Sequence, residues 1–306
     1  MLPSPSIEAT YYFSNHKVEF DVLRLDQIHP VISGNKWYKL RYYLKEAKQI
    51  NATTIASFGG PYSNHIVALA FAAKLAGLNS IGYVRCNEGE PITSSMQEAM
   101  SYGMEIKYLG RTEFQEKKTN MLFENETSKQ TETYFIDEGG YGTIGAKGAS
   151  TIISDWENNN LKTLDSNPMH VYDYIICAVG TGTMIAGIIN AAKPNQIILG
   201  IPVLKNEGSI SQEIKYLLEN KNSNFDLQHD YHQGGYAKTT AEQIQFMNKL
   251  WDQAKIPTDI VYTGKLFYAI DQLLQKNYFK TGSKALIVHS GGLQGNRSLE
   301  KGVLHF

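Results

Sequence analysis

The stretch Ser33–Leu40, with the sequence SGNKWYKL, joins a turn signal directly to an amphipathic helical pattern. Lys36 follows Gly34 and Asn35, so the turn holds this lysine at the mouth of the predicted helix. A lysine held in this way can be partly desolvated, lose its proton and form an imine with an aldehyde. A solvated lysine at a helix start is the alternative that this stretch leaves open on its own.

A second stretch, Gly180–Thr183 with the sequence GTGT, follows an apolar strand pattern and precedes a helical one. Glycine lets the backbone approach a ligand, and the free N–H groups of a helix start can hold a phosphate. The dinucleotide-binding fingerprint requires glycine or alanine where Ile185 stands, and a P-loop requires lysine where Ile188 stands. Both motifs are therefore excluded, and a phosphate-binding turn or a plain strand-to-helix turn remains.

Three more stretches complete a set: Ser57–His65 (SFGGPYSNH), Val261–Lys265 (VYTGK) and His289–Gly292 (HSGG). In this order and at this spacing, the five stretches resemble the 1-aminocyclopropane-1-carboxylate deaminase and D-cysteine desulfhydrase family. That family consists of pyridoxal-phosphate-dependent enzymes of the tryptophan synthase β fold type. The similarity runs from about residue 23 to the C-terminus, so the resemblance implies pyridoxal 5'-phosphate as the cofactor.

The resemblance also implies a role for individual residues. Taken alone, Ser63 and Asn64 are typical of a helix N-cap, and Tyr262 is typical of a core residue at a strand end. In the family, however, the serine and asparagine face the substrate and the phenolic oxygen of the cofactor, and the tyrosine stacks on the pyridine ring. His65 is a weaker match, since the deaminases have glutamine at its position. The implied cofactor-binding residues are Lys36, Lys39, Asn64, Gly180, Thr181, Gly182, Thr183, Tyr262 and Thr263. The implied catalytic residues are Lys36, Ser63 and Tyr262, and the implied substrate-binding residues are Ser63, Asn64, His65, Tyr236 and Ser290.

Two positions bear on the substrate. The cyclopropane deaminases have a glutamate where Thr263 stands and a leucine where Ser290 stands, whereas the desulfhydrase branch has small hydroxyl residues at both. A glutamate keeps the pyridine nitrogen protonated, while a hydroxyl can bond a neutral nitrogen and leaves the ring a weaker electron sink. We therefore expect a D-cysteine desulfhydrase-like carbon–sulfur lyase that forms pyruvate, ammonia and hydrogen sulfide. The alternatives are a 1-aminocyclopropane-1-carboxylate deaminase, a pyridoxal-phosphate-holding protein without turnover, and an enzyme for another phosphorylated ligand.

Short β-rich runs alternate with helical patterns along the chain, and apolar runs without strict alternation are typical of parallel sheets covered on both faces. The fold class is therefore α/β, with parallel-rich sheets and helices on both faces. Strands are expected at residues 53–58, 80–85, 104–109, 134–136, 174–179, 196–201, 260–262 and 285–289. Helices are expected at residues 64–75 and 94–102 and near Met184, Ile214, Ile244 and Leu266, and residues 111–133 are expected to be polar and solvated. The resemblance adds a division into a large cofactor-binding domain (residues 1–39 and 149–306) and a small domain (residues 40–148), with the cofactor in the cleft between them.

Composition limits the remaining classes. The 306 residues, 42% hydrophobic and 19% charged, suit a globular enzyme of about two domains, and a net charge of -1 provides no footprint for nucleic acid. Cys86 and Cys177 lack CxxC spacing and His229 and His232 lack completing ligands, so we expect neither a disulfide nor a metal site. No secretion signal or membrane span is evident, and a cytoplasmic enzyme with a small amino-acid substrate is expected. The resemblance implies a homodimer.

Overall fold

The computed structural model describes residues 6–13, 17–32, 34–87, 89–127, 132–160, 172–205, 208–220, 223 and 225–306. Ser33, the first residue of the predicted turn, lies outside them. The chain divides into two compact units, and each is described by itself. Unit 1 consists of Met1–His29, Ser33–Asn35 and Ala149–Phe306, and unit 2 consists of Pro30–Ile32 and Lys36–Gly148.

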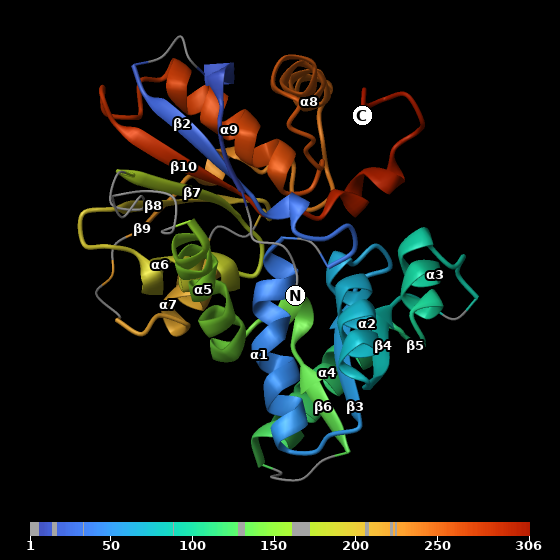
Figure 1. Ribbon diagram of the computed structural model, residues 1–306. Coiled ribbons are helices and arrows are strands. Elements are labelled where there is room, and N and C mark those ends of the chain that lie inside the picture. The colour runs from blue at the N-terminus through green and yellow to red at the C-terminus, as the bar shows by residue number, and fades with distance from the viewer. Residues whose placement is uncertain are drawn as a thin grey trace. The chain divides into compact units, whose positions relative to one another are not determined.

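Unit 1 contains a six-stranded sheet in the order β1-β2-β10-β7-β8-β9 (Figure 1). Its strands are β1 (Ser6–Ala9), β2 (Glu19–Arg24), β7 (Tyr174–Val179), β8 (Ile197–Pro202), β9 (Phe225–Leu227) and β10 (Lys284–His289). β1 runs antiparallel to β2, and every other neighbouring pair is parallel. All six residues of β7 are buried, as expected of a central strand that is covered on both faces.

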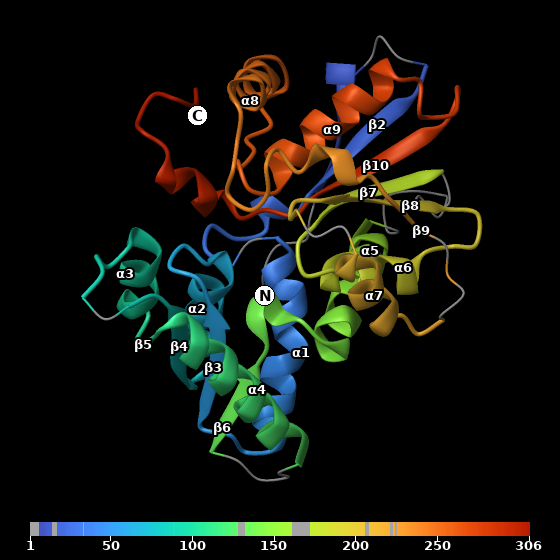
Figure 2. The same cartoon turned by 180° about the vertical axis from the view of Figure 1, so that it is seen from behind.

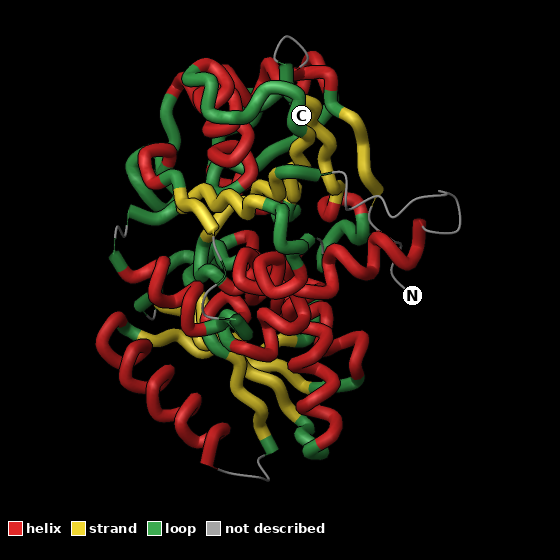
Figure 3. Tube along the Cα trace, turned by 90° about the vertical axis from the view of Figure 1, so that its left-hand side faces the viewer, coloured by secondary structure: helices red, strands yellow, loops and turns green. Residues whose placement is uncertain are grey.

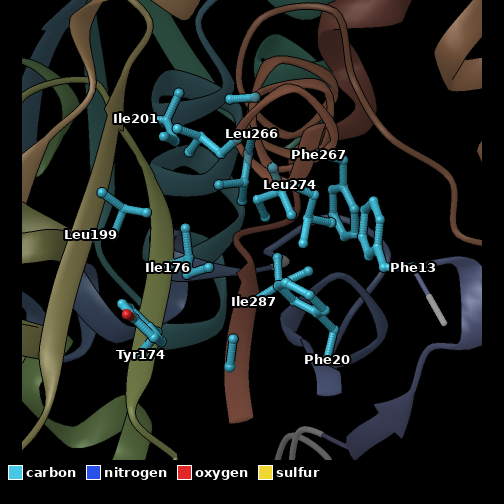
Figure 4. Packing of buried hydrophobic residues seen from close by; sticks show 14 of the residues in the cluster. Phe13, Phe20, Tyr174, Ile176, Leu199, Ile201, Leu266, Phe267, Leu274 and Ile287 are labelled. Carbon is cyan, nitrogen blue, oxygen red and sulfur yellow. The ribbon is translucent and has the colours of Figure 1, made fainter. Parts of the chain in front are cut away.

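Helices cover both faces of this sheet (Figures 1 and 2). They are α6 (Thr183–Ala191), α7 (Ser209–Tyr216), α8 (Ala241–Ala254), α9 (Thr263–Gln275) and the part of α5 (Thr143–Asn160) that follows Gly148. α6 and α9 both contact β7 and β8, and they do so from opposite faces. On the α9 face, Leu266, Phe267 and Leu274 pack with residues of the strands and with Phe13 and Phe20 to form the main hydrophobic core (Figure 4).

Unit 2 is built around a four-stranded, fully parallel sheet in the order β5-β4-β3-β6. Its strands are β3 (Thr54–Gly59), β4 (Asn79–Arg85), β5 (Met104–Leu109) and β6 (Thr133–Ile136). Its helices are α1 (Asn35–Gln49), α2 (Asn64–Ala76), α3 (Ser94–Ser101) and α4 (Arg111–Thr127). α2 contacts β3 and β4 from one face, and α4 contacts β4, β5 and β6 from the other. In both units the strands (yellow) are flanked by helices (red) in Figure 3.

Short 3-10 helices occupy several connections: η1 (Tyr11–Phe13), η2 (Leu25–Gln27), η3 (Glu138–Gly140), η5 (His229–Tyr231) and η6 (Leu293–Ser298). Among the residues that the structure describes, no helix is both long enough and apolar enough to cross a bilayer.

The architecture confirms the predicted α/β class with parallel-rich sheets and helices on both faces. One local expectation is wrong, and one segment holds more regular structure than expected. Residues 260–262 form a turn into α9 rather than a strand, because the Asp259 carboxylate accepts hydrogen bonds from the backbone N–H groups of Val261 and Tyr262. Most of the described side chains in the polar segment 111–133 are exposed, as expected, but most of the segment forms helix α4, whose Phe114 is buried against Phe58 and Tyr83. Apolar residues are sparse in this stretch, so the sequence pattern had too little periodicity to show the helix.

Close packing of α5 on α1 gives a first testable prediction. A Cβ added at Gly148 would lie 2.0 Å from the backbone oxygen of Tyr38. Alanine normally favours a helix by about 1 kcal/mol over glycine, but overpacking costs about 1–3 kcal/mol. We therefore expect Gly148→Ala to lower the free energy of unfolding in urea. Gly60→Ala is the matched control, since a Cβ there meets nothing within 4 Å, and an equal effect of both substitutions would contradict the prediction.

Candidate active site

The predicted reactive lysine follows a turn that is fixed by the C-terminal HSGG motif. The carbonyl of Ser290 accepts hydrogen bonds from the backbone N–H of Asn35 at 3.0 Å and from its side-chain amide at 3.3 Å. Gly34 has φ +65°, and a Cβ there would lie 1.6 Å from the Ser290 oxygen, so glycine is required by both conformation and space. Lys36 comes directly after Asn35 and is half-buried. The turn therefore holds the backbone at the start of α1, where Lys36 stands.

Lys39, one turn further along α1, carries a buried ammonium group. The residue is 4% exposed, and its Nζ donates to the carbonyl of Gly139 at 3.2 Å. Burial lowers the pKa of Lys39 well below its ordinary value, and the nearby charge of Lys36 lowers it further. The positive charges of Lys36 and Lys39 repel each other, so an anion bound beside them would stabilise the protonated form of both lysines.

The start of α2 provides hydrogen-bonding groups in the same unit. Ser63 is the N-cap, and its hydroxyl accepts a bond from the backbone N–H of Ile66 at 3.3 Å. Asn64 is the first helical residue, and His65 follows it. Positions at a helix N-terminus favour bound anions, because the first amides point outward and the helix dipole is positive there.

His65 is held in one tautomer. Its Nε2 lies 2.8 Å from the hydroxyl of Ser57, and that hydroxyl donates its proton to the carbonyl of Ile136 at 2.8 Å. Nε2 must therefore donate, which leaves a lone pair on Nδ1. Nδ1 is buried and has no hydrogen-bond partner among the described residues. Burial lowers the pKa of His65 well below its ordinary value, and the charges of Lys36 and Lys39 lower it further, so the ring is a neutral acceptor.

The glycine-rich turn lies between β7 and α6 in unit 1. Gly182 adopts φ +81° at the N-cap of α6 and supplies no capping side chain, while the hydroxyls of Thr181 and Thr183 lie 3.0 Å apart. A Cβ at Gly180 would lie 3.1 Å from the ring of Tyr262, so the glycine allows this ring to lie against the turn. The sequence-predicted turn and tyrosine are therefore neighbours.

Asp259 organises the residues around Tyr262 and Thr263. Its buried carboxylate accepts bonds from the backbone N–H groups of Val261 (3.0 Å), Tyr262 (3.1 Å) and Thr263 (2.8 Å). The hydroxyl of Thr263 donates to the same carboxylate at 2.7 Å and accepts from the Asp259 N–H at 2.8 Å. Burial raises the pKa of Asp259, and these bonds oppose the rise. No sequence signal pointed to Asp259, because it lies three residues before the N-cap of α9 and so does not stand at the usual capping position.

Each unit, taken by itself, contains groups that suit pyridoxal phosphate. In unit 1 the start of α6 has no capping side chain and so can take a phosphate, and Tyr262 presents a ring beside the turn. In unit 2 Lys39 is a buried lysine without a carboxylate partner among the described residues. The sequence pattern of the family described as "Pyridoxal-phosphate dependent enzyme" matches residues 2–291. The chain belongs to this family. It is accordingly a pyridoxal-phosphate-dependent enzyme.

Within this enzyme family, the chain is similar to several known proteins. A putative 1-aminocyclopropane-1-carboxylate deaminase from Thermotoga maritima is 29% identical over 291 residues, which cover 90% of this chain and 88% of that protein. A bifunctional D-cysteine desulfhydrase/1-aminocyclopropane-1-carboxylate deaminase, mitochondrial, from Arabidopsis thaliana is 27% identical over 285 residues, 86% of this chain and 70% of that protein. The crystal structure of an ACC deaminase homologue matches with a TM-score of 0.81 and 25% identity, covering 96% of this chain and 91% of that one.

Within each unit the enzyme brings several predicted residues together. In unit 2, Lys36 acts electrostatically on both Lys39 and His65. In unit 1, the ring of Tyr236 lies 6.4 Å from that of Tyr262, centroid to centroid, at an interplanar angle of 73°. Ser290 is buried, and its carbonyl bonds Asn35. Ser57 begins the SFGGPYSNH stretch but received no role from the sequence, because its hydrogen bond to His65 depends on the fold.

Proposed function

We propose that this enzyme is a D-cysteine desulfhydrase-like lyase, which eliminates a good leaving group from Cβ of a small amino acid and releases ammonia. The observation that supports this proposal is the pair Thr263 and Ser290, which stand where the cyclopropane deaminases of the family have glutamate and leucine. Both residues are buried and hydroxylated. Threonine has no carboxylate to offer a ligand, and the Thr263 hydroxyl donates its proton to Asp259.

The proposed roles follow from the chemistry of each side chain. When bound, the cofactor withdraws electrons from Cα of the substrate. The amine of Lys36 takes the α-proton as general base, and thiolate leaves from Cβ. Ser63 and the first amides of α2 bind the substrate carboxylate, and Asn64 bonds the cofactor. Addition of water then balances the reaction, in which D-cysteine and water give pyruvate, ammonia and hydrogen sulfide.

The remaining predicted residues complete this proposal. Tyr262 stacks on the cofactor ring, and Tyr236 and the neutral acceptor of His65 face the substrate. Residues 1–39 and 149–306 form the large cofactor-binding domain, and residues 40–148 form the small one. The homodimer implied by the resemblance stays a prediction, and so does the cytoplasmic location expected from the sequence pattern.

A second candidate is 1-aminocyclopropane-1-carboxylate deaminase. The names of the Thermotoga maritima relative and of the structural neighbour favour it, and the Arabidopsis thaliana relative carries both activities in its name. Opening a cyclopropane ring cannot begin with removal of an α-proton, because the substrate has none. The two functions therefore differ in what Lys36 would do first, and their products distinguish them.

The first test is attachment of the cofactor. We expect purified protein to be yellow after incubation with pyridoxal phosphate, and borohydride to fix the colour to the peptide that contains Lys36. Mass spectrometry of the digested protein locates the label. Protein that stays colourless, or a label on another lysine, would overturn the assignment of Lys36.

The second test compares substrates in one assay. We expect hydrogen sulfide from D-cysteine and chloride from β-chloro-D-alanine, each with pyruvate and ammonia, and little 2-oxobutanoate from 1-aminocyclopropane-1-carboxylate. L-cysteine and D-serine test the preferred enantiomer and leaving group. Fast ring opening without sulfide release would favour the deaminase, and coloured protein that releases no ammonia from any of these amino acids would favour a cofactor-holding protein.

A further inference from the structure

Lys265, the third residue of α9, is a wholly buried lysine to which the sequence analysis gave no role. Its Nζ donates to the carbonyl of Gly235 at 2.6 Å and lies 3.5 Å from the carbonyl of Val203, which follows β8. Its partners are therefore backbone carbonyls of two segments that are distant from α9 in the sequence.

Burying this ammonium is costly. Burial lowers the pKa of Lys265 to about 8, and the nearby Asp259 carboxylate opposes the shift. A methionine would fill a similar volume in the core without carrying a charge out of water. A specific interaction of the ammonium is needed to explain why a lysine stands here.

The segment that receives this bond has an unusual backbone. Gln233, Gly234, Gly235 and Ala237 all have positive φ, at 52°, 89°, 111° and 54°. Left-handed conformations cost non-glycine residues about 1–2 kcal/mol each, so such a loop persists only where surrounding bonds hold it. Local bonds close its turns, from Gly235 N–H to the His232 carbonyl at 3.0 Å and from Lys238 N–H to the Gly235 carbonyl at 3.2 Å. The Lys265 bond ties the loop to α9.

The bonded carbonyl controls the orientation of Tyr236. The carbonyl of Gly235 and the N–H of Tyr236 belong to one planar peptide group. A hydrogen bond that fixes this carbonyl therefore also fixes the orientation of the peptide plane to which the Cα of Tyr236 is attached. Tyr236 is 52% exposed, and its ring lies edge-on to that of Tyr262. Tyr262 in turn lies against the glycine turn at Gly180. A rotation of the Gly235 peptide would move Tyr236 away from this position.

We propose that Lys265 is a positioning residue, which holds the peptide between Gly235 and Tyr236 so that the Tyr236 ring stands beside Tyr262 on the substrate side. The assignment of these tyrosines rests on the proposed function. The bond between Lys265 and the loop does not, so the two can be tested separately.

The test uses Lys265→Met, with the exposed Lys280→Met as a matched control in the same unit. Hydrogen exchange of the cofactor-loaded protein is measured for the amides of residues 235–238 and for the core strands β7 and β10. We expect exchange in the loop to rise about tenfold or more, the size expected for loss of one hydrogen bond to a charged group, with the strands unchanged. Unchanged loop exchange, or faster exchange in the strands as well, would overturn the proposal.

Kinetics provide the second measurement, with whichever amino acid the enzyme turns over. Lys265→Met is expected to raise KM about tenfold while changing kcat little, and in a Tyr236→Ala background it should raise KM no further. Lys265→Gln keeps a donor for the Gly235 carbonyl and should recover part of the loss. Additive effects of the Lys265 and Tyr236 substitutions would contradict the proposal. Absence of turnover in every variant and in the native enzyme would instead count against the proposed function and leave the exchange result to decide on Lys265.

Discussion

Replacing Lys36 with alanine is expected to lower kcat/KM by at least ~10²–10⁴-fold, the range that a positioned general base supplies. The variant loses both the amine that anchors the cofactor and the base that takes the α-proton. Pyridoxal phosphate should still bind through the residues that hold its phosphate and ring, but borohydride should no longer attach it to the protein. The decisive measurement combines steady-state kinetics with mass spectrometry after reduction.

Two further lysine variants make this result specific. Lys45 lies exposed on the same helix, so Lys45→Ala should leave both the kinetics and the covalent label unchanged. Lys36→Arg keeps a cation beside Lys39 but cannot form the covalent link, so it should fail in the labelling assay as the alanine variant does. Undiminished turnover and labelling in Lys36→Ala would show that another amine anchors the cofactor.

The sequence alone predicted most of the regular structure. β5 and β7 have the predicted bounds, β3, β4, β6, β8 and β10 differ from them by a residue at one or both ends, and helices stand at the positions expected for α2, α3 and α6 to α9. These elements are long enough, or apolar enough, for periodicity to identify them. β1, β2 and β9 were missed. β9 has only three residues, none of them buried, and no apolar run marks it.

The candidate site was harder to predict where it depends on contacts between distant segments. The roles predicted for Lys36, Ser63 and Tyr262 come from the family resemblance of the motif stretches, and the structure places each of the three at a turn or at the start of a helix. Nothing local shows that the carbonyl of Ser290 bonds Asn35, or that Lys265 reaches Gly235. Such partners are far apart in the chain, so only the fold brings them together.

The mistaken strand at residues 260–262 has the same kind of cause. Ile260-Val261-Tyr262 is an apolar, β-branched run that is typical of a strand. The carboxylate of the preceding Asp259 accepts hydrogen bonds from the backbone N–H groups of Val261, Tyr262 and Thr263. These local bonds compete with strand pairing and favour a tight turn into α9. The structure also changes what Thr263 can offer a ligand. Because its proton is donated to Asp259, its hydroxyl presents a lone pair rather than a proton, and a bond to a neutral ring nitrogen would require it to give up Asp259.

Replacing Thr263 with valine is therefore expected to affect stability as well as activity. The backbone N–H of Asp259 donates to the Thr263 hydroxyl at 2.8 Å, and valine would leave that buried donor without its acceptor. An unsatisfied buried polar group costs about 1–3 kcal/mol, which should appear in urea unfolding of the cofactor-free protein. Thr263→Ser retains the hydroxyl and should lose much less. A valine variant as stable as the native protein would show that this bond contributes nothing to the fold.

The same substitution tests whether Asp259 and Thr263 act as one unit toward the cofactor. Asp259→Asn replaces the acceptor of four hydrogen bonds with a group that has a donor, so it should destabilise the protein more than Thr263→Val does. If the pair acts together, the double variant should lose less free energy of unfolding than the sum of the two single losses, and the difference should be about 0.5–3 kcal/mol. The affinity for pyridoxal phosphate should show the same non-additivity, because Asp259 reaches the ligand only through the hydroxyl that it orients. Additive losses of affinity would mean that Asp259 stabilises the start of α9 while Thr263 meets the cofactor independently of it.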